Sequence, residues 1–518
     1  MCYMLAAGKK ATVDGSILVA RNCDAYNESQ IVVSVPRRKH APGTMIHSSE
    51  SKRMVIPQVE ETYAYTAVLH TASEDTYPIN MGGINEFQLS AGASTGGRVK
   101  PEVEQLTPWP DSAPGDTLMT LVLERCRTAR EAIRFLGGMT EKYGARGDNY
   151  IVSDPDELWL FEQYYGYHWA AVRVPDDCFV VEANSFRLAE IHPDDPDHYL
   201  CDPDLIPFAV KHGLWDPNSG EPFHASRAYS TNEITIPGWP RIGYPQKYIN
   251  QHRIWRGNML LKPSANLDPF EPSGEYPLFL QPDKKINLAD IFNVLKDDYR
   301  GTVLDEYGAQ DEQFPTIVDP VSGHYRLSPA WSKNRLIGCP NTVTSWVTQC
   351  RKWLPDAVGG VLWAGLAATV SSPHVPFYAS NRRTPIEYQT CKPAEISIHQ
   401  EGSAYWLFKN IGNLRNLFYQ GTEDLVRPVW EAFEDNLYAH QPAVEAGAMH
   451  LYQQDRHEEV AEFLTDYSCG TALRALETGK QMLSRLWTRV SLVNTPMTTR
   501  GYTDSRGWED IGSLYMIH

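Results

Sequence analysis

The chain contains no Cys-x-x-Cys pair, although it has nine cysteines among its 518 residues. This absence excludes zinc knuckles and thioredoxin-type motifs. The cysteines are odd in number and scattered, which favours a cytoplasmic protein with reduced thiols over a disulfide-stabilised secreted one. The N-terminal residues also lack a positively charged segment followed by an apolar one, so we expect no secretory leader.

Long apolar runs and an excess of positive charge are also absent. The longest uncharged apolar stretch, Ala357–Val370, contains three glycines and is shorter than the roughly 20 residues of a membrane helix. Lys and Arg number 47 against 64 Asp and Glu, which gives a net charge of −17. This charge argues against nucleic acid and anionic membranes as partners.

The composition is otherwise that of a globular protein, with 42% hydrophobic and 21% charged residues. The 36 glycines and 36 prolines are close to the average share, which excludes collagen, low-complexity disorder and coiled coils. At about 150 residues per domain, the length allows roughly three domains or one large domain. Such a chain can bury a large core, so its stability need not depend on disulfides or a structural metal.

Hydrophobic patterning predicts β-structure near both ends of the first two hundred residues. Strands are expected at 2–8, 17–20, 31–35, 63–70 and 85–91. The segments 150–161 and 168–182 each contain two apolar strands separated by a turn with Asp and Pro. Each segment is expected to form a hairpin.

Helices are predicted between these β-segments and in the tail. One should begin after Asp116, and a second should begin at Thr128 with a capping-box pattern and end at Gly137–Gly138. A short helix is expected at Asn287–Leu295, and the pattern is helical from about Asp424 to Arg489. This order indicates an α+β fold or a layered sandwich with its sheets inside.

Position 2 carries the strongest chemical signal. Removal of the initiator methionine would leave Cys2 with a thiol and a free α-amine in one residue. An α-amine has a pKa of about 8 and can accept the thiol proton near neutral pH, so nucleophile and base would lie together. Position alone favours the simpler interpretation, in which Cys2 is an ordinary small residue at the start of a strand.

The neighbouring sequence favours the chemical interpretation. Gly8–Ser16 followed by Val19–Asp24 resembles the N-terminus of the cysteine dipeptidases of the dipeptidase A family. These are N-terminal nucleophile (Ntn) hydrolases related to penicillin V acylase and bile salt hydrolase. Further matching motifs follow in order at Gly83–Glu86, Leu158–Glu162, His168–Trp169, Val174–Asp177, Glu182–Asn184, Arg253–Arg256 and Ser345–Pro355. The helical tail matches only loosely.

The resemblance implies a role for each matching residue. Cys2 would attack a carbonyl carbon, form a thioester and release an amine. Arg21 would favour the thiolate, and Asp24 would orient the thiol and hold the α-ammonium. Asn184 would donate to the oxyanion. Arg253 would lie near the nucleophile, although Arg256 leaves the register of that match open.

Two further positions concern the substrate. Backbone N–H groups near Ser94 and Thr95 are expected to complete the oxyanion hole. Relatives carry His-Tyr-Glu-Gly-Thr where this chain has Asp298–Thr302, so Arg300 replaces a glutamate. If that glutamate receives the amino group of the substrate, Arg300 would disfavour a simple cationic dipeptide. Otherwise Arg300 forms a surface ion pair with a neighbouring aspartate.

Competing motifs are weaker. Gly92–Gly96 fits the G-x-S-x-G pattern of serine hydrolases, but Gly97–Pro101 cannot supply the helix that must follow directly. His457–Ala461 lacks the second histidine of a zinc protease helix. The acidic stretch at 194–204 lacks the spacing of a calcium loop.

We therefore expect a four-layer αββα Ntn-hydrolase sandwich, with the catalytic domain at 1–385 and a mainly helical region at 386–518 packed on it. The reaction would be amide hydrolysis without a metal or organic cofactor. Dipeptides or aminoacyl amides are the first substrate class, and N-acyl amides of the penicillin V acylase kind are the second. A non-catalytic protein resembling the secernins is the third possibility, against which the full set of Cys2, Arg21, Asp24 and Asn184 argues. A cytoplasmic homo-oligomer is expected.

Overall fold

The computed structural model describes most of the chain between Cys2 and Asn494. The described residues are 2–25, 29–48, 55–70, 77–107, 115, 117–145, 147–231, 248–305, 334–391, 398–417 and 419–494. Asp116, which was expected to precede a helix, lies outside them.

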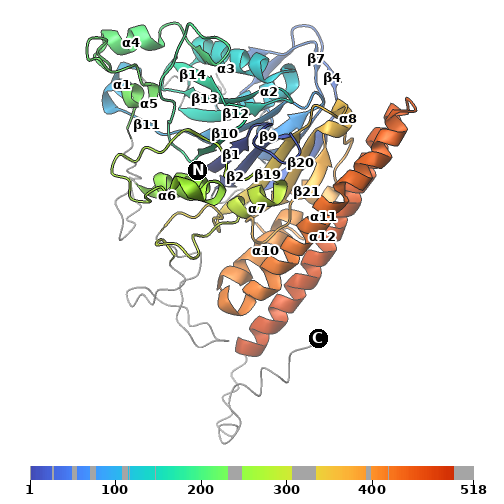
Figure 1. The fold of residues 1–518 in the computed structure, drawn as a ribbon. Coiled ribbons are helices and arrows are strands. Elements are labelled where there is room, and N and C mark those ends of the chain that lie inside the picture. The colour runs from blue at the N-terminus through green and yellow to red at the C-terminus, as the bar shows by residue number, and fades with distance from the viewer. Residues whose placement is uncertain are drawn as a thin grey trace, which may run out of the picture.

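Two antiparallel sheets form the centre of the molecule (Figure 1). The seven-stranded sheet has the order β18 (Phe279–Leu280), β15 (Phe179–Glu182), β1 (Cys2–Ala7), β2 (Ile17–Asp24), β19 (Thr342–Cys350), β20 (Val361–Leu366) and β21 (Val375–Tyr378). The eight-stranded sheet has the order β16 (Tyr199–Cys201), β14 (Trp169–Arg173), β13 (Leu158–Gln163), β12 (Asp148–Ser153), β10 (Ser90–Thr95), β9 (Ile79–Asn85), β8 (Tyr65–His70) and β3 (Gln30–Val35). Three small ribbons pair β4 (Arg38–Lys39) with β7 (Glu61–Thr62), β5 (Met45–His47) with β6 (Val55–Pro57), and β11 (Arg98–Val99) with β17 (Ser230–Thr231).

The two large sheets pack face to face. Met4 and Trp346 of the seven-stranded sheet share one buried cluster with Ile151 of the eight-stranded sheet. Trp346 lies close to the opposite backbone because Gly82 and Gly92 face its ring: a Cβ at Gly82 would lie 2.0 Å from the indole. The indole nitrogen also donates to the carbonyl of the residue before Gly82 at 3.1 Å. This contact fixes the spacing of the sandwich in its interior.

Helices cover the outer face of each sheet, which confirms the predicted four-layer αββα architecture. On the eight-stranded sheet, α2 (Thr117–Arg125) and α3 (Ala129–Tyr143) pack over a cluster that includes Trp159. On the seven-stranded sheet, α6 (Tyr248–Leu261) and α7 (Leu288–Leu295) pack over a separate cluster. The α+β class follows from these layers.

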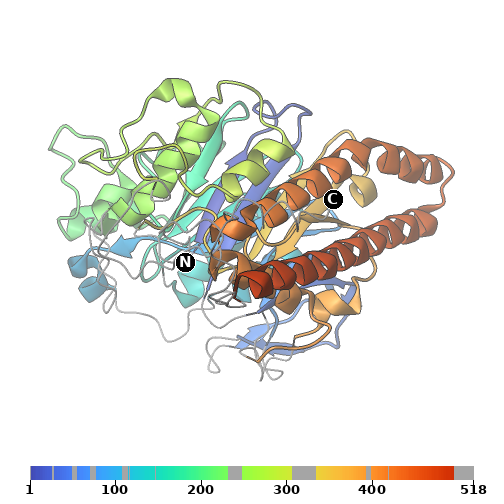
Figure 2. The same cartoon turned by 90° about the horizontal axis from the view of Figure 1, so that it is seen from below.

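The C-terminal part of the chain is helical. The long helices α11 (Tyr419–Tyr452) and α12 (His457–Asn494) form an antiparallel pair beside α10 (Ala404–Leu417), and the three lie along β20 and β21 (Figures 1 and 2). Shorter helices are α1 (Pro101–Leu106), α4 (Leu205–Lys211), α5 (Ala225–Tyr229), η1 (Pro263–Ala265), α8 (Asp356–Gly359) and α9 (Ile386–Gln389). No helix in the described ranges is long and apolar enough to cross a membrane. The division of the chain at residue 385 stays a prediction.

Local capping chemistry explains where two of the helices begin. Thr128 accepts a hydrogen bond from the Glu131 backbone at the start of α3, and Asn287 forms a capping box at the start of α7. Both starts confirm the predictions. The predicted end of α3 at Gly137–Gly138 is wrong, because the helix continues to Tyr143. Gly137 is required there by packing: a Cβ would lie 2.3 Å from the Trp169 ring.

Two predictions of β-structure are also wrong. The segment 168–182 is not a hairpin, since β14 pairs with β13 in one sheet while β15 pairs with β1 in the other. Both strands are buried on both faces, so no alternation of polar residues shows which sheet each one joins. The segment 85–91 contains the turn between β9 and β10 rather than one strand.

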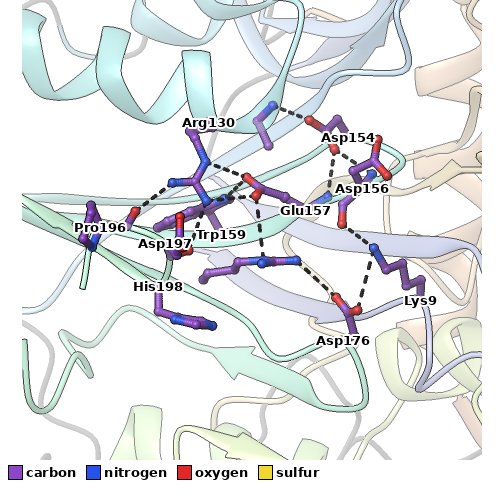
Figure 3. Close-up of polar contacts among 12 residues, drawn as sticks. Lys9, Arg130, Asp154, Asp156, Glu157, Trp159, Asp176, Pro196, Asp197 and His198 are labelled. Carbon is purple, nitrogen blue, oxygen red and sulfur yellow. Dashed lines mark hydrogen bonds and ion pairs between the residues drawn. The ribbon is translucent and has the colours of Figure 1, made fainter. Parts of the chain in front are cut away.

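An ion-pair cluster ties the two sheets together where the chain crosses between them (Figure 3). Glu157, after β12, pairs with Arg130 of α3 at 2.9 Å and with Arg173 at 4.0 Å. Arg173 also pairs with Asp176 at 3.6 Å, and Asp176 pairs with Lys9 of the β1–β2 turn at 3.7 Å. The turn after β1 and the start of α3 are therefore joined through one set of charges.

Candidate active site

The register of the β1–β2 pair brings the first chemical groups together. Cys2 lies directly opposite Cys23, and Met4 lies opposite Arg21. Residues opposite one another, and residues two apart on one strand, point to the same face of a sheet. Cys2, Cys23 and Arg21 therefore share the face that is buried between the two sheets.

Arg21 forms the direct contact with the nucleophile that the sequence predicts. Its Nη2 lies 3.0 Å from Cys2 Sγ and 3.5 Å from Cys23 Sγ. Its Nη1 donates to the carbonyl of Met81 on β9 of the opposite sheet. The Met81 carbonyl thus holds one side of the guanidinium group, while the other side faces both sulfur atoms.

The two thiols have opposite acidities. A hydrogen bond from Cys23, together with the charge of Arg21, holds the pKa of Cys2 well below its usual value despite burial. The same hydrogen bond and burial raise the pKa of Cys23 well above its usual value. Gln30 Nε2 donates to Cys23 Sγ at 3.2 Å. Cys2 is therefore the more acidic of the two thiols, and Arg21 favours its ionised form.

Asn184 contacts the main chain of Cys2. Its Oδ1 accepts from Cys2 N at 3.1 Å, and its Nδ2 donates to the carbonyl of Thr95 at 2.7 Å. Asn184 has a φ of 55°, in the left-handed region that few residues other than glycine adopt. This backbone conformation, two residues after β15, turns the Asn184 side chain back towards the start of β1. Its role as oxyanion donor stays a prediction.

Arg253 of α6 also holds the main chain of Cys2. Its Nη1 donates to the Cys2 carbonyl at 2.7 Å, and its Nη2 donates to Asn184 Oδ1 at 3.1 Å. Asn250, one turn earlier on α6, accepts from Arg253 at 2.6 Å. Arg256 instead binds Asp297 through two hydrogen bonds of 2.9 and 2.8 Å. Arg253 is therefore the arginine of this motif that lies at the nucleophile.

Asp24 ends β2 one residue beyond Cys23. Its carboxylate accepts from Arg335 at 2.6 Å and from Thr342 at 2.7 Å. Both Asp24 and Arg335 are buried. The carboxylate is thus fixed beside the hairpin, and its predicted contact with the α-ammonium of Cys2 stays a prediction.

Ser94, the serine of the G-x-S-x-G pattern, is hydrogen-bonded to a buried glutamate, Glu182, near the site. Ser94 donates to Glu182 Oε2, and Asn149 donates to Glu182 Oε1 at 2.9 Å. Ser94 lies within strand β10, and no helix follows directly. Glu182 is buried between the sheets, two residues before Asn184, so this cluster holds the strand end that carries Asn184 next to Thr95.

Arg300 takes part in a surface ion-pair network. Its Nη2 lies 2.9 Å from Asp298 and 2.9 Å from Glu423 of α11. The ion pair with Asp298 matches the second of the two interpretations given for this residue. The interpretation of Arg300 as a substrate-facing residue stays a prediction.

A cavity of about 640 Å³ adjoins the Asn184 side of the site. Its walls include Ser185 and Phe186, directly after Asn184, together with Gln251 and Ile254 of α6. Within the described ranges, no group of three or more His, Cys, Asp or Glu side chains is arranged to hold a metal ion.

Several residues of the site did not emerge from the sequence. Asn250 could have been found, because it lies one helical turn before Arg253. Cys23 lies on the returning strand of the N-terminal motif, but its place opposite Cys2 depends on the turn geometry of the hairpin. Arg335 and Glu182 reach the site through contacts between distant segments, for which the sequence carries no local signal.

One family model covers most of the chain, and several curated relatives match it over most of its length. The model of peptidase family C69 matches residues 1–432. A "Probable dipeptidase" of Latilactobacillus sakei is 26% identical over 501 residues, covering 94% of this chain and 96% of the relative. A "Probable dipeptidase" of Salmonella dublin is 28% identical over 431 residues, covering 80% of this chain and 90% of the relative. Among solved structures, a mutant of conjugated bile acid hydrolase from Clostridium perfringens is 13% identical, covers 71% of this chain and 89% of that chain, and has a TM-score of 0.30.

Proposed function

The chain belongs to peptidase family C69, and on this premise we propose that it is a dipeptidase whose nucleophile is the thiol of Cys2. The family match confirms the resemblance drawn from the sequence motifs, and the protein is a hydrolase of peptide bonds. The names of the relatives support dipeptides as the substrate class. The observation that carries the choice of nucleophile is the position of Arg21, whose Nη2 lies 3.0 Å from Cys2 Sγ.

The proposed acylation step begins after Met1 has been removed. The α-amine of Cys2 takes the thiol proton, and the thiolate attacks the carbonyl carbon of the peptide bond. A C–S bond forms while the negative charge moves to the carbonyl oxygen. When this oxyanion collapses, the C–N bond breaks and the α-ammonium gives its proton to the leaving amine. The product is a thioester on Cys2.

Deacylation reverses the proton movements. The α-amine takes a proton from water, and the resulting hydroxide attacks the thioester carbon. The C–S bond then breaks, releasing a carboxylic acid and the Cys2 thiolate. Arg21 favours this thiolate by its charge, which makes sulfur the better leaving group.

The remaining residues are proposed to position Cys2 and to stabilise the oxyanion. A side-chain amide has two N–H donors, and Asn184 uses one on Thr95 at 2.7 Å, so the second is proposed for the oxyanion. A backbone N–H near Ser94 or Thr95 would be the other donor. Arg253 fixes the Cys2 carbonyl at 2.7 Å. Asp24 is proposed to receive the α-ammonium.

Substitution of the nucleophile tests the proposal. Cys2→Ala should fold but lose dipeptide hydrolysis by a factor of about 10³ or more, because no other group replaces the thiolate. Cys126→Ala is the matched control, since Cys126 is buried in the cluster under α2 and α3 and should leave the rate unchanged. The rates are measured on a panel of free dipeptides and their N-acetyl forms. Cys2→Ala with the parent rate would overturn the proposal.

Two further measurements complete the test. The intact mass should show a chain that lacks Met1, because a retained methionine would block the α-amine. A protein that cleaves only the N-acetyl substrates would be an acylase of the second class. A correctly processed protein that cleaves neither set would be the non-catalytic alternative.

We also propose that the protein is a cytoplasmic homo-oligomer. The nine free thiols support a reducing compartment. Cell fractionation and light scattering of the purified protein test the two parts separately.

A further inference from the structure

The site contains a second sulfur atom, that of Cys23, which forms no bond with the substrate in the proposed hydrolysis. Cys23 lies directly opposite Cys2 on the neighbouring strand. Directly opposed residues in antiparallel strands have Cα atoms about 4.5–5.5 Å apart. A disulfide requires a Cα separation of about 4.4–6.8 Å. The backbone of this pair therefore already meets the main geometric requirement for a disulfide.

The side chains of the pair are directed to one point. Arg21 Nη2 contacts both sulfur atoms, at 3.0 Å for Cys2 and 3.5 Å for Cys23. A single guanidinium nitrogen can contact two sulfur atoms at these distances only if both side chains turn towards it.

The other cysteines have different surroundings. Cys350 contacts Ser153 at 3.7 Å and the Gln88 carbonyl at 3.1 Å, and burial raises its pKa to about 12. Burial also raises the pKa of Cys178 and of Cys201 to about 11 each. Peroxides oxidise thiolates rather than thiols, so these three side chains are poor targets.

We propose that Cys2 and Cys23 form a reversible disulfide when a peroxide oxidises the site, with Cys23 as the resolving cysteine. The cross-link removes the nucleophile, so hydrolysis stops until a thiol reductant restores it. The loss of activity rests on the proposed function of Cys2, whereas formation of the bond does not.

The chemistry of the two steps balances. The Cys2 thiolate attacks one oxygen of hydrogen peroxide, the O–O bond breaks, and sulfenic acid and hydroxide form. Cys23 sulfur then attacks the Cys2 sulfur, the S–O bond breaks, and the hydroxyl leaves as water with the thiol proton of Cys23. The two sulfur atoms together lose two electrons, and each of the two peroxide oxygens gains one. A dithiol reverses the result by thiol–disulfide exchange.

Cys23 would protect the nucleophile from a permanent lesion. Without a neighbouring thiol, sulfenic acid is oxidised further to sulfinic acid, which thiol reductants do not reverse. The proposal therefore predicts that Cys23 decides whether oxidation of the enzyme is reversible.

Peptide mapping of the peroxide-treated full-length protein tests bond formation directly. Trypsin cleaves after Lys9 and after Arg21, so Cys2 and Cys23 fall on separate peptides that contain no other cysteine. The wild type should yield these two peptides joined, with a mass lower by two hydrogens, and dithiothreitol should separate them. Oxidised protein in which Cys2 is sulfinic acid and no joined peptide is found would overturn the proposal.

Activity measured in parallel tests the consequence. After peroxide and then dithiothreitol, the wild type and the control variant Cys126→Ser should regain nearly full hydrolysis. Cys23→Ser and Cys23→Ala should regain under about a tenth of their own untreated rate. Full recovery in both Cys23 variants would contradict the resolving role. If the wild type has no hydrolase activity but forms the joined peptide, the proposed function fails and the disulfide stands.

Discussion

Cys2 is held by different partners through its main chain and its side chain. Its nitrogen donates to Asn184, its carbonyl accepts from Arg253, and its sulfur accepts from Arg21. These partners come from the turn after β15, from α6 and from β2, so three segments of the chain fix one residue. Such convergence places the sulfur without requiring movement during the reaction.

The donor role of Asn184 can be separated from its structural role. Asn184→Asp keeps an oxygen for the Cys2 nitrogen but has no amide N–H, so kcat should fall by about 10²–10³ with little change in KM. Asn266→Asp is the matched control, because Asn266 is exposed and also has a positive φ, of 46°. Steady-state kinetics on a dipeptide measures both constants. A raised KM at unchanged kcat would make Asn184 a substrate-binding residue instead.

Part of the site could be predicted from the sequence, because it lies on one hairpin. Arg21 follows Cys2 by a single turn, and its motif placed it on the returning strand. Cys23 was not assigned a role, since the register of a hairpin depends on the turn geometry. Arg335 lies 311 residues from Asp24 in the chain, and no local pattern records a contact of that kind.

At the level of elements, a buried charge joins α11 to the seven-stranded sheet. Glu434 binds the Lys296 ammonium after α7 and accepts from His374 Nδ1 at 2.7 Å. The other ring nitrogen of His374, Nε2, is hydrogen-bonded to Ser345 Oγ of β19 at 2.9 Å. The side chains of Lys296, Glu434 and His374 are at most 4% exposed, so the helix is tied to the sheet through a network without solvent.

This network should make stability sensitive to acid. Although burial opposes ionisation, Lys296 and His374 lower the pKa of Glu434 to about 2, below the usual value of about 4.3. The unfolded chain therefore binds the proton first as the pH falls. The stabilisation is complete above about pH 4.3 and is lost towards pH 2, by up to about 3 kcal/mol.

Glu434→Gln tests this expectation in thermal or urea unfolding between pH 7 and pH 3. At pH 7 the variant should lose about 3–5 kcal/mol, because Lys296 stays buried without a counter-charge. The difference from the wild type should shrink as the pH falls. Glu431→Gln, on the same helix but 41% exposed, is the control and should change stability by less than about 0.5 kcal/mol. A difference that is constant with pH would contradict the assignment.

Two adjacent glycines of α3 should respond in opposite directions. Gly137→Ala would place a Cβ 2.3 Å from the Trp169 ring, so it should lower the free energy of unfolding by about 1–3 kcal/mol. Gly138→Ala meets nothing within 4 Å and should raise it by up to about 1 kcal/mol, because alanine favours helix. Urea unfolding of both variants measures the effects, and equal shifts would show that packing against Trp169 is not the reason for Gly137.

Elements with local signals were predicted, and elements set by distant packing were not. The capping residues Thr128 and Asn287 marked two helix starts correctly. The end of α3 was predicted wrongly because the reason for Gly137 is a tryptophan on another strand. The hairpin predicted at 168–182 was wrong, because two apolar strands joined by a turn can belong to one sheet or to two.

At the scale of the whole molecule, the helical tail belongs to the same structure as the sandwich. The family match extends to residue 432, beyond the predicted boundary at 385. A chain ending at residue 385 would lack α9–α12 and expose the apolar surface that they cover, so it should be insoluble. A chain ending at residue 494 retains every described residue and should unfold like the full protein. Gel filtration and circular dichroism of the two chains measure this, and a soluble, folded 1–385 would show an independent domain.

The position of β1 also sets an order of events during biosynthesis. β1 is an interior strand between β15 and β2, and the Cys2 nitrogen is bonded to Asn184, which leaves the ribosome long after residue 2. The growing chain therefore exposes its first residues well before Asn184 is made, and we expect an aminopeptidase to remove Met1 in that interval. For the same reason, an affinity tag fused ahead of Cys2 would yield a folded but inactive protein, and the tag belongs at the other end of the chain.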